Sequence, residues 1–239
     1  MKQGKRSKAL AEKVAQLRGD RELLPLQDAI SIVKETVSTK FDESIELAFR
    51  LGIDSTQSDQ NVRGTVMLPK GTGKTIRIAV FASGEKQKEA EEAGADFVGS
   101  DDLAQKVQGG WTDFDLAIAT PDQMRNVGKL GKILGPKGIM PNPKSGTVTM
   151  DIKKAVEDFK SGRVEYRNDK SGNVHLAVGK ASFESADLVE NATTAVIAIL
   201  RAQPSGAKGT YLRSMTVSST MGVGIKVDTA DLRGLGKSG

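Results

Sequence analysis

The segment from Ser214 to Lys226, with the sequence SMTVSSTMGVGIK, has the most unusual set of chemical groups in the chain. Its small hydroxyls and the main-chain amides of a predicted strand pair donate well to phosphate and ribose oxygens. Gly222 permits close approach of the main chain to a surface, and Met221 can lie against a sugar or a base. The same residues are typical of a threonine-rich β-hairpin, and chemistry alone favours that ordinary structure over an RNA site.

A second stretch, LGKILGPKGIMPNPK at residues 130–144, is dense in glycine, proline and lysine. It predicts a loop with an irregular but fixed backbone, whose glycines let the main chain approach a surface and whose lysines supply charge. Lys132, Lys137 and Lys144 are therefore secondary candidates for RNA contact. A purely structural cap on the surrounding domain fits the stretch equally well.

The sequence GTGKT at residues 71–75 invites a phosphate-loop interpretation. The motif requires a first glycine at position 68, which is Leu68 here. The residues after Thr75 predict a strand, so no helix N-terminus would face the phosphates. A connection between domains is the better interpretation, and a nucleotide-dependent enzyme remains the alternative function.

The composition excludes several classes of chemistry. The chain has no Cys and a single His, at position 175, which rules out disulfides, thiolate metal sites and Ser-His catalysis. Asp96, Asp113 and Asp115 could be imagined as a magnesium site, but isolated acids near strand ends are more often solvated or capping residues. We therefore expect no catalytic residue, no metal and no cofactor.

Membrane insertion is not expected either. No apolar run approaches the roughly 18 residues that a spanning helix requires. The N-terminal sequence MKQGKRSKALAEK is charged and lacks the apolar region of a signal peptide. The sequence therefore predicts a cytoplasmic protein without a membrane partner.

Charge is segregated along the chain, whose net charge is +5. Residues 1–24 contain seven basic and three acidic residues, which predicts a basic arm, and residues 84–122 contain ten acids against three lysines. Five basic residues then follow between 125 and 144. This segregation favours an oriented anionic partner, although a solvated surface remains open. Because aromatic residues make up only 4%, a folded RNA surface is a better target than stacked single-stranded bases.

Hydrophobic periodicity predicts two kinds of structure. Alternation predicts half-buried strands at both ends of the chain, with the strand at 44–53 pairing antiparallel with 64–68. Amphipathic helices are predicted beside these strands, at 25–39 and 185–202. Further alternating strands are predicted at 164–167, 173–178, 211–218 and 223–227.

The middle of the chain predicts a parallel sheet instead. Its strands at 76–81 and 114–119 are almost continuously apolar, and helices are predicted between them. The economical topology is a split α+β domain, residues 1–69 and 160–239, that contains an inserted parallel α/β domain, residues 70–159. Both segments in which the chain passes from one domain to the other contain glycine, which suggests hinge motion between the domains. A tandem arrangement divided near residue 70 is the alternative.

Six short motifs resemble those of the bacterial ribosomal protein L-one family, the proteins of the mobile lateral stalk of the large subunit. The resemblance covers almost the whole chain, and the motifs occur in the same order. They are KFDE at 40–43, SDQNVRG at 58–64, LGPKGIMPN at 134–142, YRNDK at 166–170, GAKG at 206–209 and STMG at 219–222.

The resemblance implies a split RNA-binding domain and an inserted Rossmann-like domain that swings relative to it. Proteins of this family bind a helical junction of large-subunit ribosomal RNA and take part in release of deacylated tRNA from the exit site. In many bacteria they also repress translation of their own operon mRNA. We expect this chain to be a ribosome-bound structural protein, not an enzyme, that contacts other ribosomal components and is a monomer off the ribosome.

Position by position, the resemblance assigns RNA binding to three separate parts of the chain. It reverses the preference for an ordinary hairpin at Ser214 to Lys226 and makes the lysine-rich loop secondary. Phe41 would pack against the RNA backbone, with a core position as the alternative, and the residues after Val227 look like a flexible tail. The assigned residues are Lys40, Phe41, Asp169, Lys170, Ser214, Thr220, Met221 and Gly222.

Overall fold

The computed structural model describes residues 4–237, which fold into two compact units. Unit 1 contains the described residues up to Gly73 and from Val164 onward, and unit 2 is the segment Lys74–Arg163. Residues 1–3 of the predicted basic arm and residues 238–239 of the predicted tail lie outside the described part. No described helix has the length and apolar composition needed to cross a membrane.

The boundaries of the two units fall at residues 73 and 163 rather than at the expected 69 and 159. The buried Asn191 side chain accepts the Lys70 N–H at 3.0 Å and donates to Gly71 O at 2.9 Å, which fixes this segment to unit 1. At the second boundary, Arg163 Nη1 lies 3.1 Å from Asp158 Oδ2, and both residues belong to unit 2. These side-chain contacts cannot be read from local composition.

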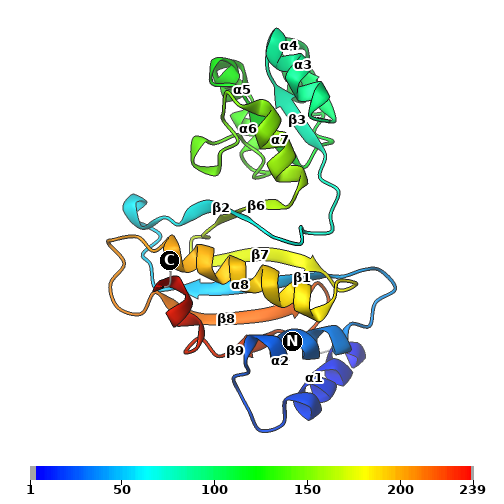
Figure 1. The fold of residues 1–239 in the computed structure, drawn as a ribbon, viewed down its shortest axis with the longest axis vertical. Helices are drawn as coiled ribbons and strands as arrows, with labels where there is room; N and C mark the ends of the chain where they lie inside the picture. Colours follow the sequence, from blue (N-terminus) through cyan, green and yellow to red (C-terminus); the bar gives the residue numbers. More distant parts are fainter. Residues whose placement is uncertain (1–3, 238–239) are drawn as a thin grey trace. The chain divides into compact units, whose positions relative to one another are not determined.

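Unit 1 is built around a four-stranded sheet with the order β7-β1-β8-β9 (Figure 1). β1 pairs antiparallel with both β7 and β8, so its two neighbours come from the far end of the chain. The main elements of unit 1 are α1 (Lys5–Arg18), α2 (Leu26–Thr36), β1 (Ser44–Leu51), β2 (Arg63–Met67), β6 (Arg163–Arg167), β7 (Asn173–Lys180), α8 (Ser185–Arg201), β8 (Leu212–Ser219) and β9 (Ile225–Val227).

The core of unit 1 lies on one face of this sheet. Ile45, Leu47, Phe49 and Leu51 alternate along β1 and are buried against apolar residues of α2 and α8. Burial of such side chains is the main favourable contribution to folding, at about 25 cal/mol per Å² of apolar surface. The predicted alternating strand is therefore confirmed, and its polar residues face the other side.

The expected pairing of residues 64–68 with the first strand is wrong. Both sides of β1 are occupied, and β2 forms a separate two-stranded sheet with β6. Asn168 fixes this arrangement, since its side chain accepts the Val62 N–H at 2.8 Å while its main-chain N–H donates to Val62 O at 3.0 Å. The ion pair of Arg63 with Glu165, at 2.6 Å, joins β2 to β6.

Within the described range the predicted basic arm is helical, and the residues predicted to form a flexible tail pack on unit 1. The basic arm forms α1, whose Leu10 and Val14 are buried. The residues after Val227 continue into a short 3₁₀ helix at Leu232–Lys237, and Leu232 belongs to the core that includes α8. Leu235 packs against the same core, so the expectation of a flexible tail is wrong for these residues.

Unit 2 contains the expected parallel sheet, with the order β4-β3-β5. Both of its faces are covered: α4 and α5 pack on one side and α3 and α7 on the other. The elements are β3 (Ile78–Phe81), α3 (Glu85–Glu92), β4 (Phe97–Gly99), α4 (Asp101–Gln108), β5 (Leu116–Ala119), α5 (Met124–Lys129), α6 (Gly131–Leu134) and α7 (Ile152–Lys160).

We predict that Asn191→Ala lowers the free energy of unfolding of the protein by about 2 kcal/mol. The substitution leaves the Lys70 N–H and the main-chain oxygens of Gly71 and Val178 without their partner, and an unsatisfied buried polar group costs about 1–3 kcal/mol. Urea unfolding followed by circular dichroism measures the change. Thr194→Ala on the same helix is the control, because its hydroxyl donates only to Glu190 O, and an equal loss there would contradict the assignment.

Candidate nucleic-acid interface

The loop that follows β8 is fixed by contacts to the start of β1. The Thr220 N–H donates to Ser44 O, and Thr220 Oγ1 accepts the Ser44 N–H, both at 3.0 Å. The Gly222 N–H donates to Ser219 O at 3.1 Å. The loop is thus held in place by main-chain contacts, and the Thr220 hydroxyl has a structural partner of its own.

Gly222 is required by close packing inside the protein. A Cβ atom at this position would lie 2.4 Å from Ser219 Oγ, well inside van der Waals contact. Ser219 is buried, and its hydroxyl forms no hydrogen bond of normal geometry. Within the protein the group that Gly222 approaches is the Ser219 side chain, and its close approach to RNA stays a prediction.

Glu43 lies beneath this loop and is fully buried, at 0% exposure. Its carboxylate accepts the Met221 N–H at 2.8 Å and the Thr39 hydroxyl at 2.8 Å. Burial alone would raise the pKa of the Glu43 carboxyl, but the Ser219 hydroxyl, these two donors and the charge of Arg6 outweigh burial and hold the pKa below its ordinary value. The group is therefore an anion at neutral pH.

Two large apolar side chains near Glu43 face solvent. Phe41 is 55% exposed and Met221 is 53% exposed. The alternative that Phe41 is a core residue is wrong, because the strand begins only at Ser44. Exposed Phe and Met side chains next to main-chain donors are well suited to contact sugars and bases.

Cations surround the same end of the sheet. Lys40 is exposed, and Lys180 Nζ donates to Ser44 Oγ at 2.9 Å. Arg6 Nη2 lies 4.0 Å from the Glu43 carboxylate. This end of unit 1 therefore combines positive charge with exposed apolar groups.

The face of the sheet opposite the core is polar and open. The register places Arg50 opposite both Asn173 and Ser214, and it places Glu46 opposite Ser218. His175 lies opposite Ala48, in the row between these two pairs, and is exposed. A polar face of this kind can contact a rigid polar surface along the roughly 20 Å that separates the ends of β1.

The turn before β7 closes the other end of this face. The Asp169 carboxylate accepts the N–H groups of Ser171 and Asn173, both at 2.8 Å. These hydrogen bonds lower the pKa of the Asp169 carboxyl, and the one from the Asn173 main chain has the largest effect. Asp169 therefore shapes the turn, while the neighbouring Lys170 side chain is exposed and its main-chain oxygen accepts the Ser55 hydroxyl.

The structure thus places the eight assigned residues around β1. Lys40, Phe41 and the loop at 220–222 lie near its first residue, and Asp169, Lys170 and Ser214 lie near Arg50. Sequence reasoning did not select Glu43, Glu46, Arg50, His175 or Lys180. Alternation along β1 and β7 indicates which of these face outward, but their grouping depends on the cross-strand register.

The lysine-rich loop lies in unit 2, not in this surface. Lys132, Lys137 and Lys144 are exposed, and Lys137 donates to the Thr112 hydroxyl. The loop backbone is held by Asn142, whose side chain accepts the Lys144 N–H at 2.8 Å. The irregular backbone expected for the whole stretch is found at residues 135–142, whereas residues 131–134 form the short helix α6, so the expectation of a loop is wrong there.

The carboxylates considered for a metal site have structural partners. Asp115 pairs with Lys74 at 2.8 Å and also accepts the Arg77 N–H, and Asp113 pairs with Arg77. Asp96 accepts the Ile78 N–H at 2.9 Å. Lys74, the lysine of the GTGKT sequence, is thus directed to a carboxylate, and the chain continues into β3 rather than into a helix.

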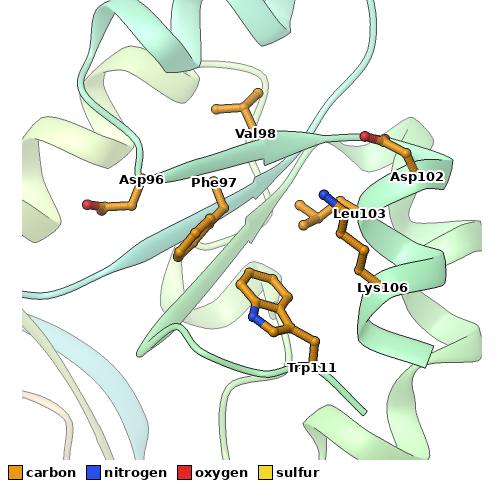
Figure 2. A pocket seen from close by; sticks show the side chains of 7 residues that line it. All are labelled: Asp96, Phe97, Val98, Asp102, Leu103, Lys106 and Trp111. Atoms are coloured by element: carbon orange, nitrogen blue, oxygen red, sulfur yellow. The ribbon is translucent and has the colours of Figure 1, made fainter. Parts of the chain in front are cut away.

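A cavity of about 620 Å³ lies along the outer strand β4 of unit 2 (Figure 2). Phe97 and Trp111 form its aromatic wall, with ring centroids 4.7 Å apart, and Lys106 reaches over it from α4. Doubly wound sheets bind nucleotides where the strand order reverses, which here is between β3 and β5. None of the cavity residues comes from either strand, so it is no nucleotide site of that kind.

The chain is similar to known proteins of the large ribosomal subunit. Residues 33–223 match the model of the ribosomal protein L1p/L10e family. The large ribosomal subunit protein uL1 of Corynebacterium efficiens is 56% identical over 225 residues, which cover 94% of this chain and 95% of that protein. The protein of the same name from Corynebacterium glutamicum strain R is 55% identical with the same coverage.

These relatives are named as proteins of the large ribosomal subunit. With a family match that spans most of the sequence and identity above one half along nearly its full length, the chain belongs to the ribosomal protein L1p/L10e family.

Proposed function

We propose that unit 1 binds a folded segment of large-subunit ribosomal RNA across the open face of its four-stranded sheet, as a structural constituent of the ribosome. The observation that carries the proposal is the convergence of sequence-distant candidate residues around β1. Phe41, Lys170 and Met221 come from three separate parts of the chain and lie next to the two ends of one strand. Membership of the family supports the same class of ligand.

The groups on this surface suit a folded RNA. Lys40, Lys170 and Lys180 provide phosphate contacts, which supply affinity without reading sequence. Phe41 and Met221 provide apolar contacts to sugars or bases, and Ser214 provides a hydroxyl for ribose or phosphate. The low number of exposed aromatic rings favours recognition of shape over stacking of successive bases.

The finer role is also a proposal. As a cytoplasmic, ribosome-bound protein, the chain would form part of the lateral stalk and assist release of deacylated tRNA from the exit site. Lys132, Lys137 and Lys144 in unit 2 are the candidates for a second RNA contact. Binding of a similar structure in its own operon mRNA would allow it to repress its translation, and off the ribosome it would act as a monomer.

We predict that Met221→Asp weakens binding of a ribosomal RNA stalk fragment by about tenfold or more. The exposed methionine would be replaced by a charge that repels phosphate and has no apolar contact to make. Fluorescence anisotropy with a labelled RNA measures Kd. Met150→Asp is the matched control, because Met150 is 59% exposed but belongs to unit 2; equal Kd values for the two variants would refute the site.

We predict that Lys170→Ala lowers the slope of log K against log salt concentration by about 0.7–0.9, the value for loss of one phosphate contact. The measurement is a series of RNA titrations at increasing KCl. Lys153→Ala on α7 of unit 2 should leave the slope unchanged. An unchanged slope for Lys170→Ala would remove this residue from the interface.

We predict that a protein lacking Lys74–Arg163, with Gly73 joined to Val164 by a short glycine linker, still binds the stalk fragment. All elements around β1 remain in unit 1, which has its own core. Circular dichroism establishes folding and anisotropy measures Kd. If the shortened protein is folded and shows no binding, unit 1 is not sufficient and the proposal is wrong.

A further inference from the structure

We propose that Glu43 is a positioning residue for RNA binding: its buried carboxylate sets the spacing between Phe41 and Met221. The inference rests on the function proposed above. It concerns a group that faces the protein interior and touches no RNA.

Glu43 joins the main chains of two segments that lie far apart in the sequence. Its Oε2 atom accepts the Met221 N–H at 2.8 Å, across 178 positions. Its Oε1 atom lies 2.8 Å from Thr39 Oγ1, and the same hydroxyl lies 2.9 Å from Phe41 O, so the Thr39 proton is shared between two acceptors. One carboxylate therefore connects the backbone of the Phe41 segment to the backbone at Met221.

A carboxylate is suited to this connection because its two oxygens accept hydrogen bonds at the same time, on a short and rigid group. The charge itself works against an RNA site, since it repels phosphate, and full burial increases the cost of ionisation. Arg6, at 4.0 Å, is the nearest cation, and it is on the surface of α1. A buried anion at this place is therefore best explained by the geometry it imposes.

Packing beneath the loop makes that geometry stiff. Gly222 packs so close to Ser219 that a Cβ would reach 2.4 Å from the hydroxyl, and its N–H donates to Ser219 O at 3.1 Å. From the buried side, Glu43 accepts the Met221 N–H. Together, these contacts hold the main chain at Met221, from which the exposed side chain extends, in a fixed relation to the Phe41 segment.

The test compares Glu43→Leu, Glu43→Gln and Thr39→Val. Leucine fills the volume but accepts no hydrogen bond, so Kd for the stalk fragment should rise by about tenfold or more, as expected when a charged hydrogen bond that orients a site is lost. Glutamine still accepts from Met221 and can donate to Thr39, so Kd should stay within about threefold of wild type. Thr39→Val breaks only the connection to Phe41, and an intermediate loss is expected even if Glu43→Leu does not fold.

Stability and positioning are separated by a control and a second measurement. Asn191→Ala removes a buried polar group from the same unit, on α8 and outside the RNA surface, so it should lower stability without changing Kd. All Kd values are measured at a temperature where each variant is folded by circular dichroism. Hydrogen exchange of the Met221 amide should accelerate in Glu43→Leu and not in Asn191→Ala.

The positioning role would be overturned if Glu43→Leu and Thr39→Val both bound the RNA with the wild-type Kd. It would also be overturned if Asn191→Ala raised Kd as much as Glu43→Leu does. Neither result would affect the assignment of the RNA surface, because that assignment depends on Met221→Asp and its Met150→Asp control. Absence of RNA binding in the wild type would instead refute the proposed function.

Discussion

The pairing of β1 with β7 and β8 is the constraint on which the rest of unit 1 depends. Both neighbours come from the far end of the chain, and together they place the loops at 169–172 and 219–222 at opposite ends of β1. Such contacts close long loops, and folding that relies on them is slower than folding through local contacts. The pairing brings residues that are distant in the sequence together on one sheet. The inserted unit has its own core.

Several acidic residues in this protein hold the backbone. Asp96 and Asp115 accept main-chain N–H groups at the start of β3, and Asp169 closes the turn beside Lys170. Glu43 has the same role in the interior. Carboxylates accept several amide hydrogen bonds at once and do so more strongly than neutral groups. At the proposed RNA surface the charges of Glu43 and Asp169 repel phosphate, so these two residues are best explained by the backbone geometry that they hold.

Family membership and local geometry give complementary information. The match over residues 33–223 establishes what kind of protein this is, and the contacts around β1 indicate how individual residues are used. Thr220 illustrates the difference, since its hydroxyl is bonded to the main chain of Ser44. Thr220 thus shapes the loop, whereas Phe41 and Met221 are the exposed side chains of the proposed RNA surface.

The sequence by itself determined the local features. Alternation fixed which face of β1 is buried, continuous apolar strands indicated the parallel sheet of unit 2, and spaced motifs indicated the family. Only the tertiary structure decided which strands are neighbours: it paired β2 with β6, set Ser214 opposite Arg50, and brought Glu43 under Met221. The physical reason is that side-chain periodicity depends on each strand alone, whereas register depends on non-local hydrogen bonds and packing that the local pattern does not encode.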